Sequence, residues 1–443
     1  MVRHGILVGL LALAAAVPLR AGEGASRAEV ETLRRQLREQ QARLDALEGL
    51  LRGTIAKDVA ALRKEVDAVG ARANARPFAS WAEKVKFNGD FRYRHEWTDD
   101  EDKSRERARH RVRLRLGLEA HPTEDLDLYV RLVTGGDNPR GTNQTLDGAF
   151  SSKDLMLDRA YVDWHPASLQ GVHLLAGKMA QPWRHPGSSQ LIWDSDISPE
   201  GLAATSETPI TETTRAFATV GSFWVDESSS DEDILLWACQ VGVTHEIAEA
   251  AKFTLGGSYF HYHNLQGRTP LFDPTTGYGN TTQTVTKTTT LDCTAGGDPV
   301  ICTEESEVYT QGYRLWEFFC VFETTAAGLP MALYGDYVNN TAATSGQDTG
   351  WLVGCTLGTA KAPGTWQLDY NYRRVENDAV IGAFTESDFH GGRTGGEGHK
   401  VTAAYQVNKA AQVALTYFLS NDEDESANND NYRKLQVDFK VKF

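Results

Sequence analysis

Long apolar runs are missing from this sequence, and so are the marks of several common protein classes. Apart from one N-terminal segment, no stretch of its 443 residues approaches the roughly 18–20 apolar residues of a membrane-spanning helix. Five cysteines are too few for a scaffold built on disulfides. The 45 Lys and Arg are outnumbered by 60 Asp and Glu, and the net charge of −15 argues against nucleic-acid binding. What remains is a soluble multidomain protein or a transmembrane β-barrel, whose strands are only half apolar.

Motifs for catalysis are missing as well. The sequence contains no Gly-x-Ser-x-Gly, His-Glu-x-x-His, Cys-x-x-Cys or phosphate-loop pattern. His261 and His263 share a strand face but have no third ligand nearby, which favours a pair in a barrel wall over a metal site. We therefore expect neither an enzyme nor a bound cofactor or metal.

The N-terminus has the three-part layout of a secretory signal peptide. A short basic start is followed by the uncharged segment Gly5–Val17, and Ala21 offers a small residue at a cleavage point. This pattern predicts export, with residues 1–21 removed and the mature chain starting at about Gly22.

Residues 22–76 differ in composition from the rest of the chain. Apolar residues fall on heptad a and d positions, and after Gly53 the phase slips before the spacing resumes. The seam residues are Val30, Leu33, Leu37, Leu44, Leu47 and Leu51, then Val59, Leu62, Val66 and Val69, with Gln40 at one d position. A narrow seam on a charged helix favours a periplasmic coiled coil of about six heptads, interrupted near Gly53. A single amphipathic helix lying on a partner is the alternative.

From residue 81 to 443 the hydrophobic period changes to two, as in Val85–Arg94 and Arg111–Leu118. The expected strands begin near residues 85, 110, 126, 155, 171, 201, 214, 233, 252, 309, 330, 349, 364, 399, 411 and 431. Their connections alternate between short turns and long polar loops. An even strand number, with short turns at one rim and long loops at the other, predicts a 16-stranded antiparallel transmembrane β-barrel. A soluble barrel has no reason to keep its short and long connections at opposite rims.

The barrel region also resembles a known family. It is similar to the putative porins of Gram-negative outer membranes that carry an N-terminal coiled coil, and more loosely to alginate-export barrels. The resemblance lies in Phe87–Arg94, Asp158–Trp164, Ala176–Lys178 and Trp193–Leu202, and in the alternating last strand that ends at Phe443. It implies an outer-membrane location with both barrel ends on the periplasmic side, and it does not identify a solute.

The polar strand faces should line the lumen, since the lipid face must be apolar. This assigns seven arginines to the pore: Arg92, Arg94, Arg111, Arg113, Arg115, Arg131 and Arg159. For any single arginine, an ion pair that stiffens the wall is an equal alternative. Three arginines on one strand face exceed the carboxylates beside them, so we expect a pore that favours anions.

Two outer loops are candidates for narrowing the lumen. The segment 181–200 is too aromatic for a solvated loop, and Trp193, Asp194, Asp196 and Glu200 are its expected constriction residues. The longer segment 264–307 is the other candidate, and a loop packed over the barrel mouth is the alternative for both.

The cysteines and the acidic loops complete the expected picture. Cys293 and Cys302 fall in one outer loop and are expected to form a disulfide. Cys239, Cys320 and Cys355 are in phase with lipid-facing neighbours and are expected to be small buried hydrophobes, neither paired nor metal ligands. Acidic runs in the outer loops could meet the divalent cations that bridge lipopolysaccharide, or could simply be solvated.

Together these features predict an outer-membrane porin for passive diffusion of small hydrophilic, anionic solutes, contacting outer-membrane lipid and lipopolysaccharide. A homotrimer is expected because coiled-coil seams self-associate. Two other functions stay open. One is a selective exporter of an acidic polysaccharide, and the other is a structural tether in which the coiled coil contacts the cell wall.

Overall fold

A computed structural model describes residues 27–74, 84–101, 103–229, 231–249, 251–291, 300–423 and 431–443. The chain divides into two compact units, residues 1–82 and 83–443, and each is described here by itself. The predicted signal peptide, residues 1–21, lies outside the described residues.

The first unit contains one long helix, α2 (Arg27–Asn74), of 48 residues. It runs through Gly53 without a break, so the interruption predicted there affects the apolar seam and not the backbone. Seam side chains such as Leu44, Leu47 and Leu51 are about 60% exposed on this helix (59%, 59% and 62%). An apolar stripe left this open needs a partner surface.

Among the described residues, no helix is both long and apolar enough to cross a membrane.

The second unit is a closed antiparallel barrel, as the sequence predicted. Within the described residues its sixteen strands are β1 (Val85–Asp100), β2 (Arg107–Thr123), β3 (Leu126–Thr134), β5 (Leu155–Trp164), β6 (Val172–Lys178), β7 (Glu200–Pro209), β8 (Thr214–Asp226), β9 (Ile234–Ala248), β10 (Ala251–His263), β13 (Tyr313–Ala326), β14 (Leu329–Asn340), β15 (Thr349–Gly358), β16 (Trp366–Val375), β17 (Gly396–Gln406), β18 (Ala411–Asp422) and β19 (Asn431–Lys442). The two-residue strand β4 (Gln144–Thr145) adds to β2 from a loop.

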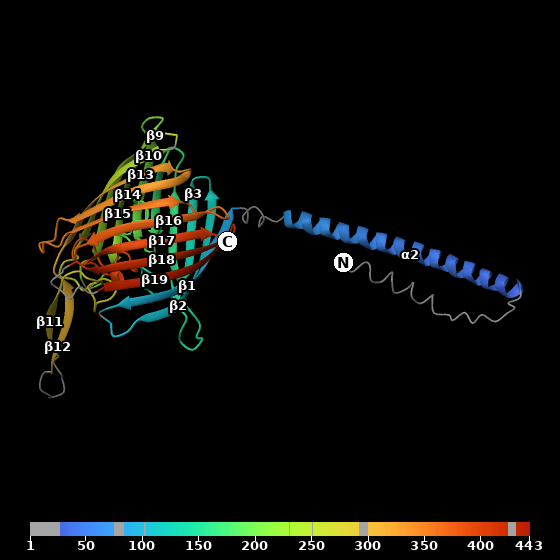
Figure 1. Cartoon of the computed structure of the whole chain (residues 1–443), viewed down its shortest axis with the longest axis horizontal. Helices are drawn as coiled ribbons and strands as arrows, with labels where there is room; N and C mark the ends of the chain where they lie inside the picture. Colours follow the sequence, from blue (N-terminus) through green and yellow to red (C-terminus); the bar gives the residue numbers. More distant parts are fainter. Residues whose placement is uncertain are drawn as a thin grey trace. The chain divides into compact units, whose positions relative to one another are not determined.

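Each barrel strand pairs with the next along the chain, and β1 pairs with β19 to close the ring (Figure 1). At this closure the backbone of Phe443 exchanges two hydrogen bonds with Gly89, at 2.9 and 3.0 Å. The terminal residue is therefore held in the barrel wall, and full closure leaves the barrel no open sheet edge.

The connections differ at the two rims, as predicted. Turns such as those joining β2 to β3 and β13 to β14 contain only two residues, whereas the other rim carries long loops. One of these loops, within 264–312, contains a separate hairpin of β11 (Thr282–Leu291) and β12 (Val300–Tyr309) that extends beyond the barrel at the end away from the C-terminus (Figure 1). This hairpin lies in a segment that was expected to be a loop throughout.

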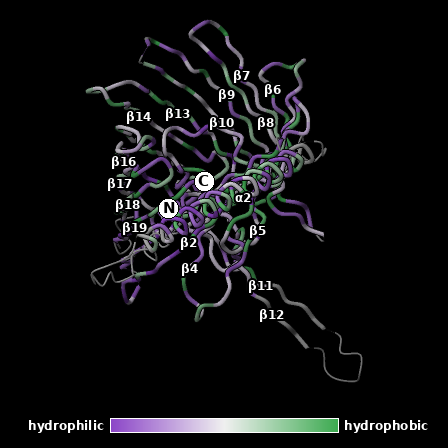
Figure 2. The backbone as a smooth tube through the Cα atoms, turned by 90° about the vertical axis from the view of Figure 1, so that its right-hand side faces the viewer, coloured by the Kyte–Doolittle hydropathy of each residue, from purple (hydrophilic) through white to green (hydrophobic). Residues whose placement is uncertain are grey.

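Alternation along the strands separates an apolar outer face from the interior, and Figure 2 shows hydrophilic and hydrophobic residues interleaved along the barrel. Cys239, Cys320 and Cys355 are unpaired, and Cys239 is exposed beside the outward-facing Trp237. The predicted Cys293–Cys302 disulfide lies outside the described residues, because Cys293 and the side chain of Cys302 are not among them.

Candidate channel aperture

The loop between β6 and β7, residues 179–199, lies inside the barrel. Its apolar side chains are buried: Met179, Trp183, Leu191, Ile192, Trp193 and Ile197. The Trp183 and Trp193 rings pack at a centroid distance of 4.6 Å, and both contact Phe260 of β10, at 5.4 and 5.5 Å. Aromatic contacts of this kind add about 0.5–1.5 kcal/mol each beyond the burial of area. The loop is thus packed onto one wall and narrows the lumen.

Polar contacts hold the same loop to the same wall. The Gln240 side chain of β9 accepts a hydrogen bond from the backbone N–H of Arg184 and donates one to its carbonyl, at 2.7 and 2.9 Å. Ser189 donates to Asp336 of β14 at 2.6 Å. Because these groups are buried, breaking such bonds would leave unsatisfied polar atoms, at a cost of about 1–3 kcal/mol each.

A second loop, residues 376–395, also enters the barrel, and the sequence analysis did not predict it. It contains the short 3-10 segment η1 (Phe389–Gly392) and the buried residues Val380 and Ile381. The two loops are tied together by Asp194, whose carboxylate accepts the Ser387 N–H at 2.8 Å and whose own N–H donates to the Phe384 carbonyl at 2.7 Å. Two inward loops therefore form one inner wall.

Between this inner wall and the strands of the opposite wall lies a cavity of about 160 Å³, here called the aperture. Charged side chains of both signs line it. The cations are Arg92, Arg94, Arg113, Arg140, Lys400 and Lys440, and the carboxylates are Asp194, Asp196, Glu386, Asp388 and Asp438. The arrangement can hold water and small polar solutes between two charged surfaces.

All seven predicted arginines contact interior groups. Arg94 forms a bidentate pair with Asp438 of β19, at 2.6 and 2.9 Å. The three arginines of β2 each meet a carboxylate, because Arg111 lies 3.7 Å from Glu96, Arg113 lies 2.5 Å from Asp90, and Arg115 pairs with Asp196.

These partners correct the expectation that the β2 arginines exceed the carboxylates beside them. The carboxylate missing from the sequence count is Asp196, which reaches Arg115 from the first inward loop and not from a neighbouring strand.

Arg131 and Arg159 lie beside a break in strand register. The pairing of β3 with β5 shifts between Arg131 and Leu132, which leaves Asp158 as an extra residue on β5. Arg131 pairs with Asp158, and Arg159 donates to Ser198 of the first loop at 3.2 Å. The bulge thus lets two consecutive residues, Asp158 and Arg159, both serve the interior.

The expected constriction residues separate into three groups. Trp193 is buried in the apolar packing of the loop, and Asp194 and Asp196 line the aperture. Glu200 does not lie there, and its assignment to the constriction is corrected. It is the first residue of β7, and its carboxylate, 60% exposed, pairs with Lys178 at 2.7 Å.

Several aperture residues were not singled out by sequence reasoning. Gln436, Asp438 and Lys440 were recognised as part of the polar face of the last strand, but not as site residues. A closed 16-stranded ring places the last strand beside the first. The polar face of the last strand could therefore have been expected next to Arg92 and Arg94. The contribution of Glu386 and Asp388 had no comparable sequence signal.

The carboxylates of the two loops have pKa values shifted in different directions, because their charged neighbours differ. Burial and the neighbouring Asp196 raise the pKa of Asp194 to about 7. Burial alone would raise the pKa of Asp196 too, but the guanidinium groups of Arg115 and Arg113 hold it below its usual value. The pKa of Asp388 is also lowered despite burial, because Lys434 and Arg94 stabilise its charge. Asp194 is therefore the aperture carboxylate that titrates near neutral pH.

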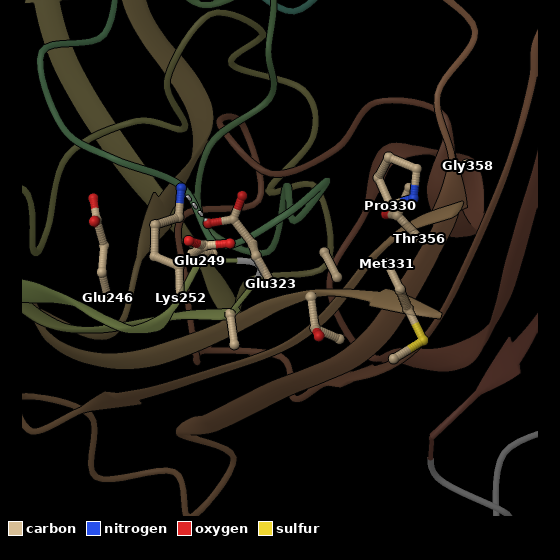
Figure 3. Close-up of a pocket in the computed structure, with 11 residues that line it drawn as sticks. Glu246, Glu249, Lys252, Glu323, Pro330, Met331, Thr356 and Gly358 are labelled. Carbon is tan, nitrogen blue, oxygen red and sulfur yellow. Dashed lines mark ion pairs between the residues drawn. The ribbon is translucent and has the colours of Figure 1, made fainter. Parts of the chain in front are cut away.

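At the rim with short turns, a hollow of about 440 Å³ opens among the ends of β9, β10, β13, β14 and β15. Figure 3 shows Lys252 near Glu246, Glu249 and Glu323, with an ion pair to Glu323 at 2.7 Å. Acidic groups thus outnumber basic ones in this hollow, here called the vestibule. Among the described residues, no three His, Cys, Asp or Glu side chains are grouped so as to hold a metal ion.

Comparisons with known proteins agree with this architecture. The family model described as "Putative porin" matches residues 98–314 and 320–443, which is most of the chain. A search of curated proteins found no match.

Among solved structures, OprB of Pseudomonas putida is similar with a TM-score of 0.53 and 13% identity, over 83% of this chain and 96% of that chain. OmpF of Salmonella typhi, solved with daunomycin, is similar with a TM-score of 0.46 and 11% identity, over 81% and 97%. The likeness to OprB shows a shared fold. The closed barrel, its narrowed lumen and the family match identify an outer-membrane channel, and the chain belongs to the putative porin family.

Proposed function

We propose that this porin lets small hydrophilic solutes diffuse through its aperture and that it favours anions. The observation that supports this is the charge of the aperture lining, with six cationic side chains and five carboxylates. A narrow pore with low-dielectric walls focuses the field of such groups, so a small excess of positive charge raises the local concentration of anions. The acidic net charge of the whole chain, −15, lies largely elsewhere.

Export of an acidic polysaccharide is less well supported. A polyanion would need a basic lining along the whole bore, whereas the vestibule has three glutamates, Glu246, Glu249 and Glu323, around Lys252. A pure tether is also disfavoured, because it would have no use for a charged cavity between the inward loops and the barrel wall.

The test is a planar-bilayer recording of the full-length protein under a KCl gradient. We expect a steady current with a reversal potential on the anion-selective side. Arg314→Gln is a matched control, because Arg314 is exposed on the outer face of β13 and should not affect the reversal potential. A cation-selective reversal potential would contradict the anion preference, and the absence of steady current would contradict the channel.

We further propose that α2 lies in the periplasm, where it joins copies of the protein into a homotrimer. The support is its apolar seam, which includes Leu44, Leu47 and Leu51 and is open on the single helix. A helix of 48 residues is about 72 Å long, which would also let it approach the cell wall. The apolar outer face of the barrel would contact outer-membrane lipid, and the acidic outer loops would face lipopolysaccharide.

Replacing Leu44, Leu47 and Leu51 together by Glu should prevent helix association, because like charges would face each other in the seam. Chemical crosslinking of membranes and native mass spectrometry should show trimers for the wild type and mostly monomers for the variant. A matched variant with Glu39, Asp45 and Glu48 changed to Gln alters three charges without altering the seam, and it should remain trimeric. A wild-type monomer would refute the proposal.

A further inference from the structure

The positive charge of the aperture is not evenly compensated. Asp438 serves three cations, but only Arg94 holds it closely, with both of its oxygens bonded. Arg92 lies 3.9 Å from the same carboxylate and Lys440 lies 3.7 Å from it. Arg94 also reaches Asp388 at 3.2 Å, whereas among the described residues Asp438 is the only carboxylate within 4 Å of Arg92 or of Lys440.

The strand register explains this imbalance. Across the closure of the barrel Lys440 is directly opposite Arg92, and Arg92 is directly opposite Arg113 of β2. These three side chains form one row on β19, β1 and β2, here called the cationic row. The adjacent rows each contain an acid: Lys442–Asp90–Arg115 on one side and Asp438–Arg94–Arg111 on the other. Like charges directly opposite each other destabilise a sheet, so the cationic row carries a cost.

Lys440 and Arg92 keep N–H donors that are not used in hydrogen bonds to described residues. The Lys440 ammonium makes no hydrogen bond to any described residue, and its side chain is 30% exposed, more than that of Arg92 or Arg113. Arg92 donates to the Asn143 side chain at 2.5 Å, and its Nε has no hydrogen-bond partner among the described residues. Arg113 is held by Asp90 and contributes mainly charge.

The surroundings favour a small guest. All three members of the row line the aperture, and Thr402, Thr416 and Gln436 line it beside them. A volume of about 160 Å³ corresponds to roughly five water molecules, which is room for one carboxylate or phosphate group together with a few waters. Three of the four loop carboxylates that line the aperture are already in ion pairs, Asp196 with Arg115, Asp388 with Lys434 and Glu386 with Lys400. The fourth, Asp194, accepts the backbone N–H groups of Asp196 and Ser387.

We propose that the cationic row Lys440–Arg92–Arg113 is a binding subsite for a single oxyanion group, a carboxylate or a phosphate, of the passing solute. This rests on the proposed anion-favouring channel and names the group that it recognises. An oxyanion between Lys440 and Arg92 would accept hydrogen bonds from both, and it would supply the negative charge that the row lacks. The subsite would hold such solutes briefly in the aperture and so select them over chloride.

The experiment measures chloride current through single channels while phosphate or acetate is added at constant ionic strength. A bound oxyanion should reduce the chloride current in a saturable way. Arg92→Gln combined with Lys440→Gln should raise the half-blocking concentration by about tenfold or more, since each substitution removes one charge-assisted hydrogen bond to the oxyanion. Lys440→Arg keeps the charge and should block as the wild type does.

Arg215→Gln combined with Lys86→Gln is the matched control. It also removes one arginine and one lysine charge, from side chains that are 60% and 65% exposed and do not line the aperture, and should change the block by less than about threefold. If the double variant of the row fails to insert, Lys440→Gln alone makes the test, because this side chain has no hydrogen bond to lose.

The outcomes separate the two proposals. Block by phosphate alone or by acetate alone assigns the subsite to that group, and block by both assigns it to oxyanions in general. A wild-type channel that prefers anions but is not blocked by either ion refutes the subsite and leaves the proposed function intact. Block that is equal in the row variant and the control also refutes it. A cation-selective wild type refutes the proposed function itself.

Discussion

The interior of this barrel has two unlike sides. On β1, β2 and β19 the inward residues are largely charged, and Arg92, Arg94, Arg113, Asp438 and Lys440 line the aperture. On β9, β10 and β13 the inward residues are largely apolar, such as Leu236, Phe260 and Leu315, and they are covered by the first inward loop. The difference shows that a polar inner face is required only where the barrel holds water. Where a loop replaces the water, the inner face follows the rules of a globular core.

The largest effect on the difference between the two sides is expected from a substitution on the apolar side. Trp193→Ala should destabilise the loop by about 3–5 kcal/mol, because it removes a buried ring that contacts Trp183, Phe260 and Phe384. Single-channel conductance should rise as the loop leaves the wall, and the thermal unfolding midpoint in detergent should fall. Trp237→Ala, on the outer face of β9, is the control and should leave the conductance unchanged. An unchanged conductance in the Trp193 variant would show that the loop does not narrow the channel.

On the charged side, replacing Arg111, Arg113 and Arg115 together by Gln should shift the reversal potential toward cations. Three positive charges are lost, and Asp90 and Asp196 lose their ion-pair partners, whereas Glu96 keeps Arg109 and Lys434. The shift should be largest at about 0.01 M salt and small at about 1 M, where the Debye length falls from about 30 Å to about 3 Å. A reversal potential that stays at the wild-type value in low salt would mean that these arginines serve only the structure of the wall.

The smallest expected effect concerns Asp194, which ties the two inward loops together. Its pKa of about 7 means that the aperture carries one negative charge fewer at pH 6 than at pH 8. Anion preference should therefore be stronger at pH 6, and Asp194→Asn should remove this dependence. Because the pKa is above that of an unfolded aspartate, about 3.9, the stabilising effect of the protonated group is lost as the pH rises from about 4 to about 7. A reversal potential with the same pH dependence in both proteins would contradict this assignment.

Sequence reasoning succeeded where the signal is local. Every barrel strand begins within four residues of its predicted start, because alternation with period two is written into each strand. The phase of Arg111, Arg113 and Arg115 also followed from this local pattern.

It failed where the structure depends on contacts between distant segments. The pairing of Arg115 with Asp196 and the tie between Asp194 and Ser387 join residues far apart in the chain, and no periodicity encodes them. The apolar side was hidden for a related reason. Residues 234–239 of β9, Ile-Leu-Leu-Trp-Ala-Cys, are apolar on both faces, so alternation cannot tell which face meets lipid and which meets the loop.

The register in which β1 meets β19 shows what determines the pairing of the first and last strands. Sliding these two strands by two residues would keep every side chain on its present face, and it would place Asp438 opposite Arg92, Lys440 opposite Asp90 and Lys434 opposite Glu96. That slipped register would match opposite charges three times, yet it is not the one observed. In a barrel, the stagger accumulated over all the strands determines how the last strand meets the first. The circumference of the whole ring, and not local attraction at the joint, thus keeps Lys440 and Arg92 side by side.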